Sequence, residues 1–408
     1  MHICLISPGH LSTNPRLVKE AAALRESGHR VSIVCGRYLP WGVAADHAIA
    51  AELEPVTAVP FGPSQLQPIA YLRATMMRHL ARALVRAGWR SESLIDRAQH
   101  PAAGGLARAA KAIPADLYIA HYVAALPAAA AAAKLHGAAY AFDAEDFHLG
   151  DLPERPEHAF ERDLICAIES RLLPHAAFVT TAAPLIADAY CAAYDIAPPT
   201  VVLNACSRRR APAGPTLKGV QAPGPSVYWF SQVIGPGRGL EALIDAASQA
   251  QSAPHLYLRG SIAAAYAAQL QARAERLGIG NQLHLLELVA PGELELAGAH
   301  FDLGYAGELM NSPNHERALS NKLFSYLSSG IPVVISETPA QCAIAPQMGD
   351  AALTFPVGDA GALAQAIDAM LAPGRQPQSR RVAWELGQGR FAWETEAAKI
   401  VCLVQGCQ

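Results

Sequence analysis

The sequence lacks any long uncharged apolar stretch. A membrane-spanning helix needs about 18 or more consecutive apolar residues, and the alanine-rich run at 124–133 is too short and too weakly apolar. The first residues, MHICLISPGH, lead directly into a strand and lack the charged-then-apolar order of a signal peptide. We therefore expect a cytoplasmic protein, with any membrane contact peripheral and at the inner face.

An excess of charge of one sign is also missing, because 32 basic and 35 acidic residues give a formal net charge of −3. This balance argues against a nucleic-acid partner. The chain of 408 residues is 51% apolar and 16% charged, which is typical of a globular protein with about two or three domains. Its eight cysteines form no CxxC pair and show no metal-ligand spacing. We interpret them as reduced, mostly buried thiols and expect no bound metal.

Short apolar runs alternate with longer helical stretches along the whole chain. In the first half, 3–7 has the pattern of a strand and 15–27 that of an amphipathic helix, and the alternation continues through DLYIAHY, AAYAFDAED and AAFVTTA. A second series begins at VYWFSQ. This order predicts βαβ units and an α/β fold of two doubly wound, Rossmann-like domains with parallel sheets.

A change of composition marks the expected domain boundary. The segment SRRRAPAGPTLKGVQAPGPS is rich in proline, glycine and basic residues and has no apolar period. We predict an N-terminal domain over 1–206, a linker over 207–225 and a C-terminal domain over 226–384. The final helical segment, 385–408, is assigned to the N-terminal domain.

The first turn of the second domain is rich in glycine. In WFSQVIGPGRGLEALIDAA, a strand leads into a loop that contains Gly235, Gly237, Arg238 and Gly239, and a helix follows. Glycines let backbone amides approach an anion, and the helix N-terminus adds partial positive charge. Arginine supplies a fork of donors suited to phosphate oxygens. The alternative is that the loop is only a tight turn.

A second cation stands at the start of the helix in ALSNKLFSYLSSGIPVVISETPAQ. Ser320 is placed to cap this helix and Gly330 to end it, but Lys322 lies in the first turn, where the helix dipole favours an anion. Arg238 and Lys322 both follow strands of one predicted sheet, and such strand ends form the ligand crevice of doubly wound folds. We predict a diphosphate site. The alternative places the two cations on separate solvated loops.

Arginines at 78, 82, 86 and 90 recur every four residues within 71–97 and predict one basic helical stripe. The stripe is either a solvated helix face or an amphipathic helix that lies on an anionic membrane or against an anionic acceptor.

Carboxylates are concentrated in FDAEDFH, where Asp143, Glu145, Asp146 and His148 follow a predicted strand. Two carboxylates could grip a divalent ion on a diphosphate. We favour a different role, because the doubly wound pattern already provides a metal-free diphosphate site. Asp146 or Glu145 would face the cleft and orient an acceptor hydroxyl, and a plain cap-and-turn role is the alternative.

Several of these motifs together resemble the GT-B glycosyltransferases, especially the retaining family four. SNKLFSYLSSGIPVVIS resembles their nucleotide helix, in which a phrase of the type NKLFEYLAAGxPVV recurs, and GPGRGLEALIDA resembles their phosphate loop. QLHLLELVAPGELELAGAHFDLGY is similar to their next βαβ turn, RFAWETEAAKI to their final helix, and SPGHLSTNPRLVKEAAALRESGHRVSIV to their first β-loop-α-β unit. The resemblance omits 41–114 and the linker. It implies two Rossmann-like domains that face across a cleft, with the last helix crossing back.

The resemblance also implies roles for single residues. A histidine after an N-terminal strand lies beside the donor sugar in such enzymes, and His121 has that place. A structural histidine is the alternative. The donor would be a nucleotide-diphosphate sugar, with a UDP-sugar slightly favoured, and no cofactor is implied. The implied donor-site residues are Arg238, Lys322, Gly237 and Gly239 for the diphosphate, and Ser325, Asn321 and Leu288 for the nucleotide.

The sequence departs from the family pattern in both halves. Ser325 stands where the family has the glutamate that binds ribose, and the glutamate beside the sugar aligns ambiguously with Glu316 or Glu308. The usual glycine pair of the first loop is replaced by PGH, so the acceptor side is expected to be specialised. The catalytic candidates are therefore His121, Glu316 and Asp146, and the acceptor-side candidates are His10, Asn14, Arg16 and Glu145.

These observations predict a glycosyltransferase that moves a sugar from a nucleotide-diphosphate donor to a glycan, lipid-linked or small-molecule acceptor bound mainly by the N-terminal domain. By resemblance the anomeric configuration is retained, and the departing phosphate serves as the base. Two alternatives remain open: a sugar-nucleotide 2-epimerase of the same fold, and a catalytically silent sugar-nucleotide-binding subunit. The sequence leaves the base, the sugar, the acceptor and the oligomeric state open.

Overall fold

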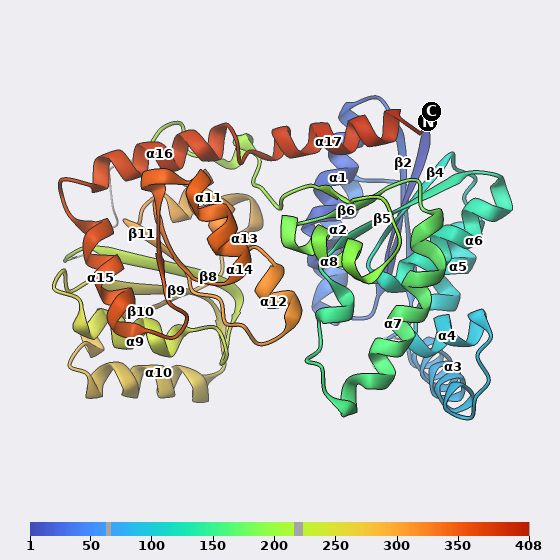
Figure 1. Ribbon diagram of the computed structural model, residues 1–408, viewed down its shortest axis with the longest axis horizontal. Helices are drawn as coiled ribbons and strands as arrows, with labels where there is room; N and C mark the ends of the chain where they lie inside the picture. Colours follow the sequence, from blue (N-terminus) through green and yellow to red (C-terminus); the bar gives the residue numbers. More distant parts are fainter. Residues whose placement is uncertain (63–66, 216–222, 408) are drawn as a thin grey trace. The chain divides into compact units, whose positions relative to one another are not determined.

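The computed structural model describes residues 1–62, 67–215 and 223–407, and the chain divides into two compact units. Unit 1 comprises Met1–Val202 and Ala397–Gln408, and unit 2 comprises Leu203–Glu396. Both are α/β units with a parallel sheet between helices, which confirms the predicted fold class (Figure 1). Part of the expected linker, 216–222, lies outside the described residues.

The sheet of unit 1 is parallel, with the strand order β3-β2-β1-β4-β5-β6-β7. Its central strands are apolar and almost completely buried, because helices cover both faces of a doubly wound sheet. The strands are β1 (His2–Ser7), β2 (Arg30–Arg37), β3 (Val56–Pro60), β4 (Leu117–His121), β5 (Ala139–Glu145), β6 (Val179–Thr181) and β7 (Thr200–Val201).

Some helices of unit 1 pack on this sheet, and others pack on neighbouring helices. The first of them begins at a proline directly after its cap, Asn14, whose side chain accepts a hydrogen bond from the amide of Leu17. The helices are α1 (Pro15–Glu26), α2 (Pro40–Glu52), α3 (Pro68–Arg86), α4 (Glu92–Gln99), α5 (Ala103–Lys111), α6 (Leu126–His136), α7 (Ala159–Leu172) and α8 (Pro184–Ala193).

The sheet of unit 2 is also parallel and has the order β10-β9-β8-β11-β12-β13. Side chains from its strands and from the helices on one face form a continuous core that includes Trp229, Leu243 and Ile367. The strands are β8 (Ser226–Ile234), β9 (His255–Ile262), β10 (Leu283–Leu286), β11 (Leu303–Ala306), β12 (Val333–Ser336) and β13 (Ala352–Phe355).

The helices of unit 2 follow the predicted alternation closely. The helix predicted from the NKLFSYL motif ends just before Gly330, whose φ of +70° is the left-handed conformation expected after a helix C-cap. The helices are α9 (Leu240–Gln249), α10 (Ala264–Arg276), α11 (Leu294–Gly298), α12 (Pro313–Arg317), α13 (Asn321–Ser328), α14 (Pro339–Ile344), α15 (Ala360–Leu371) and α16 (Gln376–Gln388), and α17 (Trp393–Gln405) begins in unit 2 and continues in unit 1.

Each sheet reverses its strand order at one place. The order runs outward in opposite directions from β1 and β4 in unit 1, and from β8 and β11 in unit 2. In open α/β sheets, ligands bind beyond the carboxyl ends of the strands at such a switch point. The loops after β1 and β4, and those after β8 and β11, are therefore the places to look for a site in each unit.

The last helix, α17, is divided between the units. The amide of Trp393 donates to the carbonyl of Cys206 at 2.8 Å, and the carboxylate of Glu396 accepts from the amide of Leu203 at 2.8 Å. These contacts hold the start of α17 on residues of unit 2. Only the part from Ala397 onward belongs to unit 1, whereas the sequence assigned everything from 385 to the N-terminal domain.

The expectation that the cysteines are mostly buried is wrong. All eight are free thiols, but only Cys4 and Cys35 are buried. Thiols placed on outward-facing helix positions escape the core even though cysteine is usually an apolar, buried residue. The exposed cysteines are Cys166, Cys191, Cys342 and Cys402.

The segment 71–97 is a helical hairpin and not the single helix that its arginine period predicted. Helix α3 ends at Arg86, Gly88 takes a φ of +94°, and α4 begins at Glu92. Figure 1 shows both helices beside α7. Over the described residues, no helix combines the length and apolarity needed to cross a membrane.

Candidate active site

The glycine loop after β8 has a fixed shape that exposes Arg238. Gly237 and Gly239 have φ angles of +75° and +72°, a region that residues with a Cβ rarely adopt. The carbonyl of Gly239 accepts a hydrogen bond from the hydroxyl of Tyr305 at 2.9 Å. A Cβ at Gly239 would lie 2.8 Å from the carbonyl oxygen of Gly307. Gly239 therefore brings the loop against the end of β11, and the Arg238 side chain stands in solvent.

Glu308, in the loop after β11, gathers the polar groups of this region. Lys322 Nζ lies 2.9 Å from Glu308 Oε1, and the Ser320 hydroxyl donates to the same oxygen at 2.6 Å. Burial alone would raise the pKa of Glu308, but Lys322, Ser320 and the nearby charge of Arg238 together lower it. Glu308 is therefore an anion. Ser320 occupies the N-cap position of α13, but its hydroxyl donates to Glu308 and accepts no hydrogen bond from a helix amide.

Lys322 therefore pairs with Glu308 in unit 2, and Arg238 lies near enough for its charge to lower the pKa of the same carboxylate. Arg238 follows β8 and Lys322 begins α13, while Glu308 follows β11, so all three lie at the switch point of the sheet. Lys322 also lies 5.6 Å from the centre of the Trp229 ring, which fixes it further. Two cations against one anion leave a surplus of positive charge here, as a diphosphate requires.

The residues expected at the nucleotide differ in exposure. Leu288, in the loop after β10, is 55% exposed, and Asn321 is exposed at the start of α13. Ser325 is buried, and its hydroxyl lies 3.4 Å from both Glu295 Oε1 and Cys206 Sγ. Glu295 was not predicted. Its Oε2 atom is buried without a hydrogen-bond partner among the described residues, and no motif in the sequence around it would have identified it.

Glu316 is not brought into the Lys322 cluster by any contact among the described residues. It lies on α12 and pairs with Arg317 at 3.5 Å, on a half-exposed surface. Of the two glutamates that the sequence left open for the place beside the sugar, Glu308 is the one that joins the phosphate-site cations.

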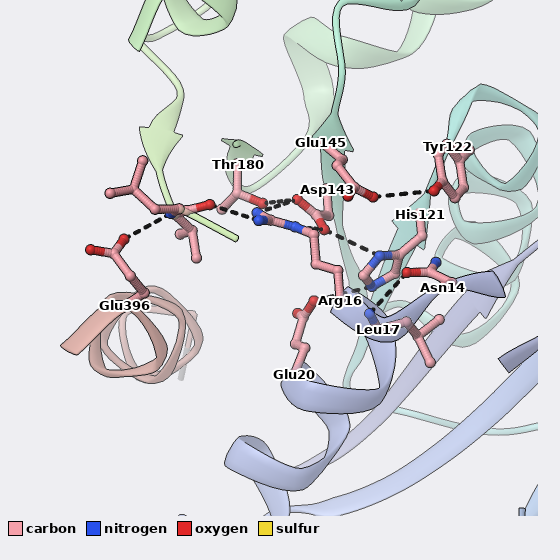
Figure 2. A network of polar contacts seen from close by, with 12 residues as sticks. Asn14, Arg16, Leu17, Glu20, His121, Tyr122, Asp143, Glu145, Thr180 and Glu396 are labelled. Carbon is pink, nitrogen blue, oxygen red and sulfur yellow. Dashed lines mark hydrogen bonds and ion pairs between the residues drawn. The ribbon is translucent and has the colours of Figure 1, made fainter. Parts of the chain in front are cut away.

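At the switch point of unit 1, a buried network of charges surrounds His121 (Figure 2). Arg16 donates two hydrogen bonds to Asp143, from Nε to Oδ2 at 2.6 Å and from Nη2 to Oδ1 at 2.9 Å. His121 stands between two carboxylates, with Nδ1 3.1 Å from Asp143 and Nε2 3.1 Å from Glu20. These last contacts are ion pairs that lack hydrogen-bond alignment. Thr180 completes the network with a hydroxyl bond to Asp143 at 2.7 Å.

The surroundings of His121 differ from those expected of a sugar contact. The side chain is 1% exposed, and both ring nitrogens face carboxylates of unit 1. Burial would lower the pKa of His121, but the charges of Glu20 and Asp143 outweigh it and raise the pKa to about 9. Arg16 and His121 in turn hold the pKa of Asp143 well below its usual range, although burial acts in the opposite direction. The network is thus two cations against two anions.

Two of the acceptor-side candidates support the first loop from within. His10 is fully buried: its Nδ1 lies 2.6 Å from Asp46, and its Nε2 accepts hydrogen bonds from the amides of Tyr38 and Leu39. Asn14 is 1% exposed and caps α1. With Arg16, which is equally buried, these side chains shape the loop and present no surface to an acceptor in this structure.

The carboxylates after β5 are divided among separate partners. Glu145 has a positive φ of 57° and accepts a hydrogen bond from the Tyr122 hydroxyl at 3.2 Å. His148 is buried against Glu169 and the Tyr190 hydroxyl. Asp146 is half-buried, and its carboxylate forms no hydrogen bond or ion pair with a described residue. Asp146 is therefore the member of this segment that remains available to a ligand.

A metal-binding geometry also exists around His121. Ligand atoms of Glu20, His121 and Asp143 all lie within 4.8 Å of one another. However, the Arg16 guanidinium already binds both oxygens of Asp143. An added divalent ion would meet this buried cation at close range, so the residues present do not suit a metal.

Comparison with known families assigns both halves of the chain. Residues 13–207 match the model of the glycosyl transferase 4-like domain, and residues 224–373 match that of the glycosyl transferases group 1. The chain belongs to the GT-B glycosyltransferases. The first match spans the His121 network, and the second spans the loop of Arg238 and the helix of Lys322. A comparison with curated proteins gives no match.

Solved glycosyltransferase structures share the fold over the full length of the chain. HepE from Anabaena, in complex with UDP-glucose, aligns with a TM-score of 0.68 at 18% identity and covers 100% of both chains. Sucrose-phosphate synthase from Thermosynechococcus elongatus aligns with a TM-score of 0.69 at 14% identity, covering 100% of this chain and 98% of that one. The lipopolysaccharide outer core galactosyltransferase WaaB, in its apo form, gives 0.63 at 13% identity with 100% coverage of both.

Proposed function

We propose that this glycosyltransferase uses a nucleotide-diphosphate sugar, with UDP as the nucleotide, and transfers the sugar with retention of configuration to an acceptor held by unit 1. The observation that carries the donor assignment is the Lys322–Glu308 pair with the charge of Arg238 close by, at the switch point of the unit 2 sheet. The structural similarity to a UDP-glucose complex supports UDP. We also propose that the enzyme is cytoplasmic.

The proposed chemistry depends on the charge of the leaving group. As the bond between the sugar and the phosphate breaks, negative charge grows on the diphosphate, and Arg238 and Lys322 neutralise it. The amides of the loop at 235–239 and the N-terminus of α9 add partial positive charge. Glu308 holds Lys322 in place before the donor arrives. The departing phosphate oxygen takes the proton from the acceptor hydroxyl, so no protein nucleophile is required.

A 2-epimerase would need acid and base groups free to reach the sugar. Of the groups after β5 that could serve, Asp143 is held by Arg16 and His148 by Glu169. Asp146 alone is uncommitted among these described side chains, and we propose that it orients the acceptor hydroxyl. Incubation with a UDP-sugar alone separates the two reactions, because only epimerisation proceeds without an acceptor.

The donor site is tested by Arg238→Ala and Lys322→Ala. Each substitution removes charge-assisted hydrogen bonds to phosphate worth roughly 1.5 to 3 kcal/mol, so UDP affinity should fall about tenfold to 100-fold while uridine affinity stays the same. Calorimetric titration of both ligands measures this. Arg276→Ala is the matched control, because Arg276 is an exposed arginine on α10. Equal losses for UDP and uridine would refute the diphosphate assignment.

A further inference from the structure

A cavity of about 590 Å³ lies in unit 1, bounded by β3, α3, α5 and the end of α4. Its size is in the range of small-molecule binding sites, about 300 to 1,000 Å³. Small residues leave this space open. Gly105 is one of the small residues in its wall, and a Cβ at this position would lie 2.5 Å from Val59 Cγ1, so α5 lies close to β3 here. The cavity is separate from the His121 network and from the donor site of unit 2, and none of the roles assigned so far uses it.

Four arginines surround this cavity: Arg73, Arg78, Arg97 and Arg108. Among the described residues that line it, none is an aspartate or a glutamate. Arg73, Arg97 and Arg108 are exposed and make no side-chain hydrogen bond or ion pair with any described residue. Arg78 has only a long hydrogen bond to the carbonyl of Ala98, at 3.4 Å.

Neighbouring arginines of the same hairpin behave differently. Arg82 pairs with Glu161 and Arg90 pairs with Asp163, both on α7, and Arg82 and Arg86 lie over the ring of Phe160. Glu161 and Asp163 of α7 therefore pair with arginines of the hairpin that face α7. Arg82, Arg86 and Arg90 of the predicted stripe therefore face α7, whereas the arginines that line the cavity form no ion pair with a described residue.

Burial and neighbouring positive charge both affect the titratable groups that line the cavity. Burial, and then the charge of Arg82, lower the pKa of Arg78, and they outweigh the opposite effect of Glu161. Burial, and then the charge of Arg78, lower the pKa of His100 to about 4, so this lining residue is neutral at pH 7. Its Nδ1 accepts a hydrogen bond from the amide of Ala102, which leaves the proton on Nε2 as a donor. A bound anion would relieve the repulsion between these cations.

Exposed apolar residues on α3 indicate the kind of molecule to which the bound anion belongs. Ile69, Leu72, Met76 and Leu80 follow one another at helical spacing and are 83%, 58%, 56% and 54% exposed. They form an exposed apolar stripe beside a cavity whose wall includes Phe61 and Met77. An apolar helix face next to a cluster of arginines fits a lipid surface with anionic headgroups.

We propose that the acceptor of the sugar transfer is a lipid that carries a phosphate or diphosphate group, and that the four-arginine cavity binds this group. The inference rests on the proposed transferase function for the identity of the ligand as acceptor. Guanidinium forks match phosphate oxygens bidentately, and several of them around one cavity suit a group with more than one negative charge. The apolar stripe of α3 then lies against the lipid.

The first test measures binding of a short-chain alkyl diphosphate in the presence of saturating UDP, which occupies the other diphosphate site. The double variant Arg73→Ala/Arg108→Ala should lose about tenfold in affinity for each arginine removed. Neither side chain forms a hydrogen bond or ion pair with a described residue, so melting temperature and UDP affinity should be unchanged. Arg30→Ala, at an exposed arginine of β2, is the matched control and should bind as the wild type does. Equal affinity in all three proteins would overturn the cavity assignment.

The second test separates lipid from soluble phosphate. The protein should co-sediment with phosphatidylcholine vesicles that contain phosphatidic acid and not with phosphatidylcholine alone, and added salt should weaken the association. Leu72→Ser/Met76→Ser should reduce vesicle binding while leaving alkyl diphosphate binding intact. Unchanged vesicle binding in this variant would overturn the lipid component and leave a soluble phosphorylated ligand.

Failure of the cavity assignment and failure of the transferase proposal give different results. If the arginine variants lose alkyl diphosphate and the wild type turns over no UDP-sugar with any phospholipid acceptor, the cavity is a lipid phosphate site and the acceptor role is refuted. If the arginine variants keep full affinity and UDP binding still depends on Arg238, the donor assignment stands and the cavity proposal is refuted.

Discussion

His121 carries its proton in a fully buried setting, and this ionisation should make stability depend on pH. Its pKa is raised from 6.5 to about 9 in the folded protein, so its contribution is complete below pH 6.5 and is lost as the pH rises through 9. A rise of this size corresponds to about 3 kcal/mol. Asp143 has the opposite sign, since its lowered pKa contributes stability above its unfolded value that is lost in acid.

The test is His121→Asn, followed by thermal unfolding at several pH values. The variant should be less stable than the wild type at pH 6, and the difference should shrink as the pH passes 9. His148 also has a raised pKa, about 8, but it is present in both proteins and cancels in the difference. His47→Asn, at an exposed histidine of α2, serves as the control and should change little at any pH. A deficit that stays constant from pH 6 to pH 10 would contradict the ion-pair assignment.

The same variant decides between the two roles of His121. A contact with the donor sugar would lower the catalytic constant without lowering the melting temperature, because that interaction is made in the transition state. A buried ion pair lowers the melting temperature and leaves activity per folded molecule intact. The positions of both ring nitrogens favour the second result.

The glycine loop offers a matched pair of substitutions. Gly237 and Gly239 both have positive φ angles, but a Cβ at Gly237 would meet nothing within 4 Å, whereas one at Gly239 would contact Gly307 and Tyr305. Gly237→Ala should therefore lose only about 1 kcal/mol of stability through backbone strain. Gly239→Ala should lose more and should also weaken UDP binding, because the loop must move away from β11.

Melting temperature and UDP affinity, measured on the two glycine variants, check this expectation. Equal effects of the two alanines would mean that close packing at Gly239 does not set the position of the loop. A Gly239→Ala protein with normal UDP affinity would separate the shape of the loop from diphosphate binding.

Elements with strong local signals were predicted well, and those that depend on distant contacts were not. Helix α13 has a cap position, apolar spacing and Gly330 at its end, and it lies where expected. In the hairpin of α3 and α4, the arginine period continued past Gly88 and masked the break. The edge strand β3 was missed because most of its side chains are exposed, so no buried-strand pattern marks it.

The same distinction applies to the two sites. Alternating apolar runs predicted two parallel-sheet units, and the motifs around Arg238 and Lys322 placed both residues in loops at the switch point of one sheet, since strand ends gather at one edge of a sheet. The network of Arg16 and Asp143 joins residues 127 positions apart. No local pattern shows that such residues will be buried against each other, so Arg16 was expected at the acceptor and lies in the interior. The cavity itself was missed for the same reason: Arg78 belongs to the predicted stripe, but α3, α4 and α5 contribute the arginines of the cavity separately.

The two units should respond to different ligands, and hydrogen exchange of the intact chain can show this. Ligand at 100 times its dissociation constant stabilises the state that binds it by about 2.7 kcal/mol, and openings that release the ligand become rarer to the same degree. UDP should therefore slow exchange of amides at 235–241 and 320–323 in unit 2. A short-chain alkyl diphosphate, added after UDP has reached saturation, should slow exchange at 97–105 in unit 1. The Arg73→Ala/Arg108→Ala variant should lose the second effect and keep the first, because its donor site is unaltered.

Two outcomes would contradict this expectation. Protection by alkyl diphosphate that persists in the variant would mean that the ligand binds elsewhere. Protection at 97–105 by UDP alone would contradict the assignment of the two anions to separate units.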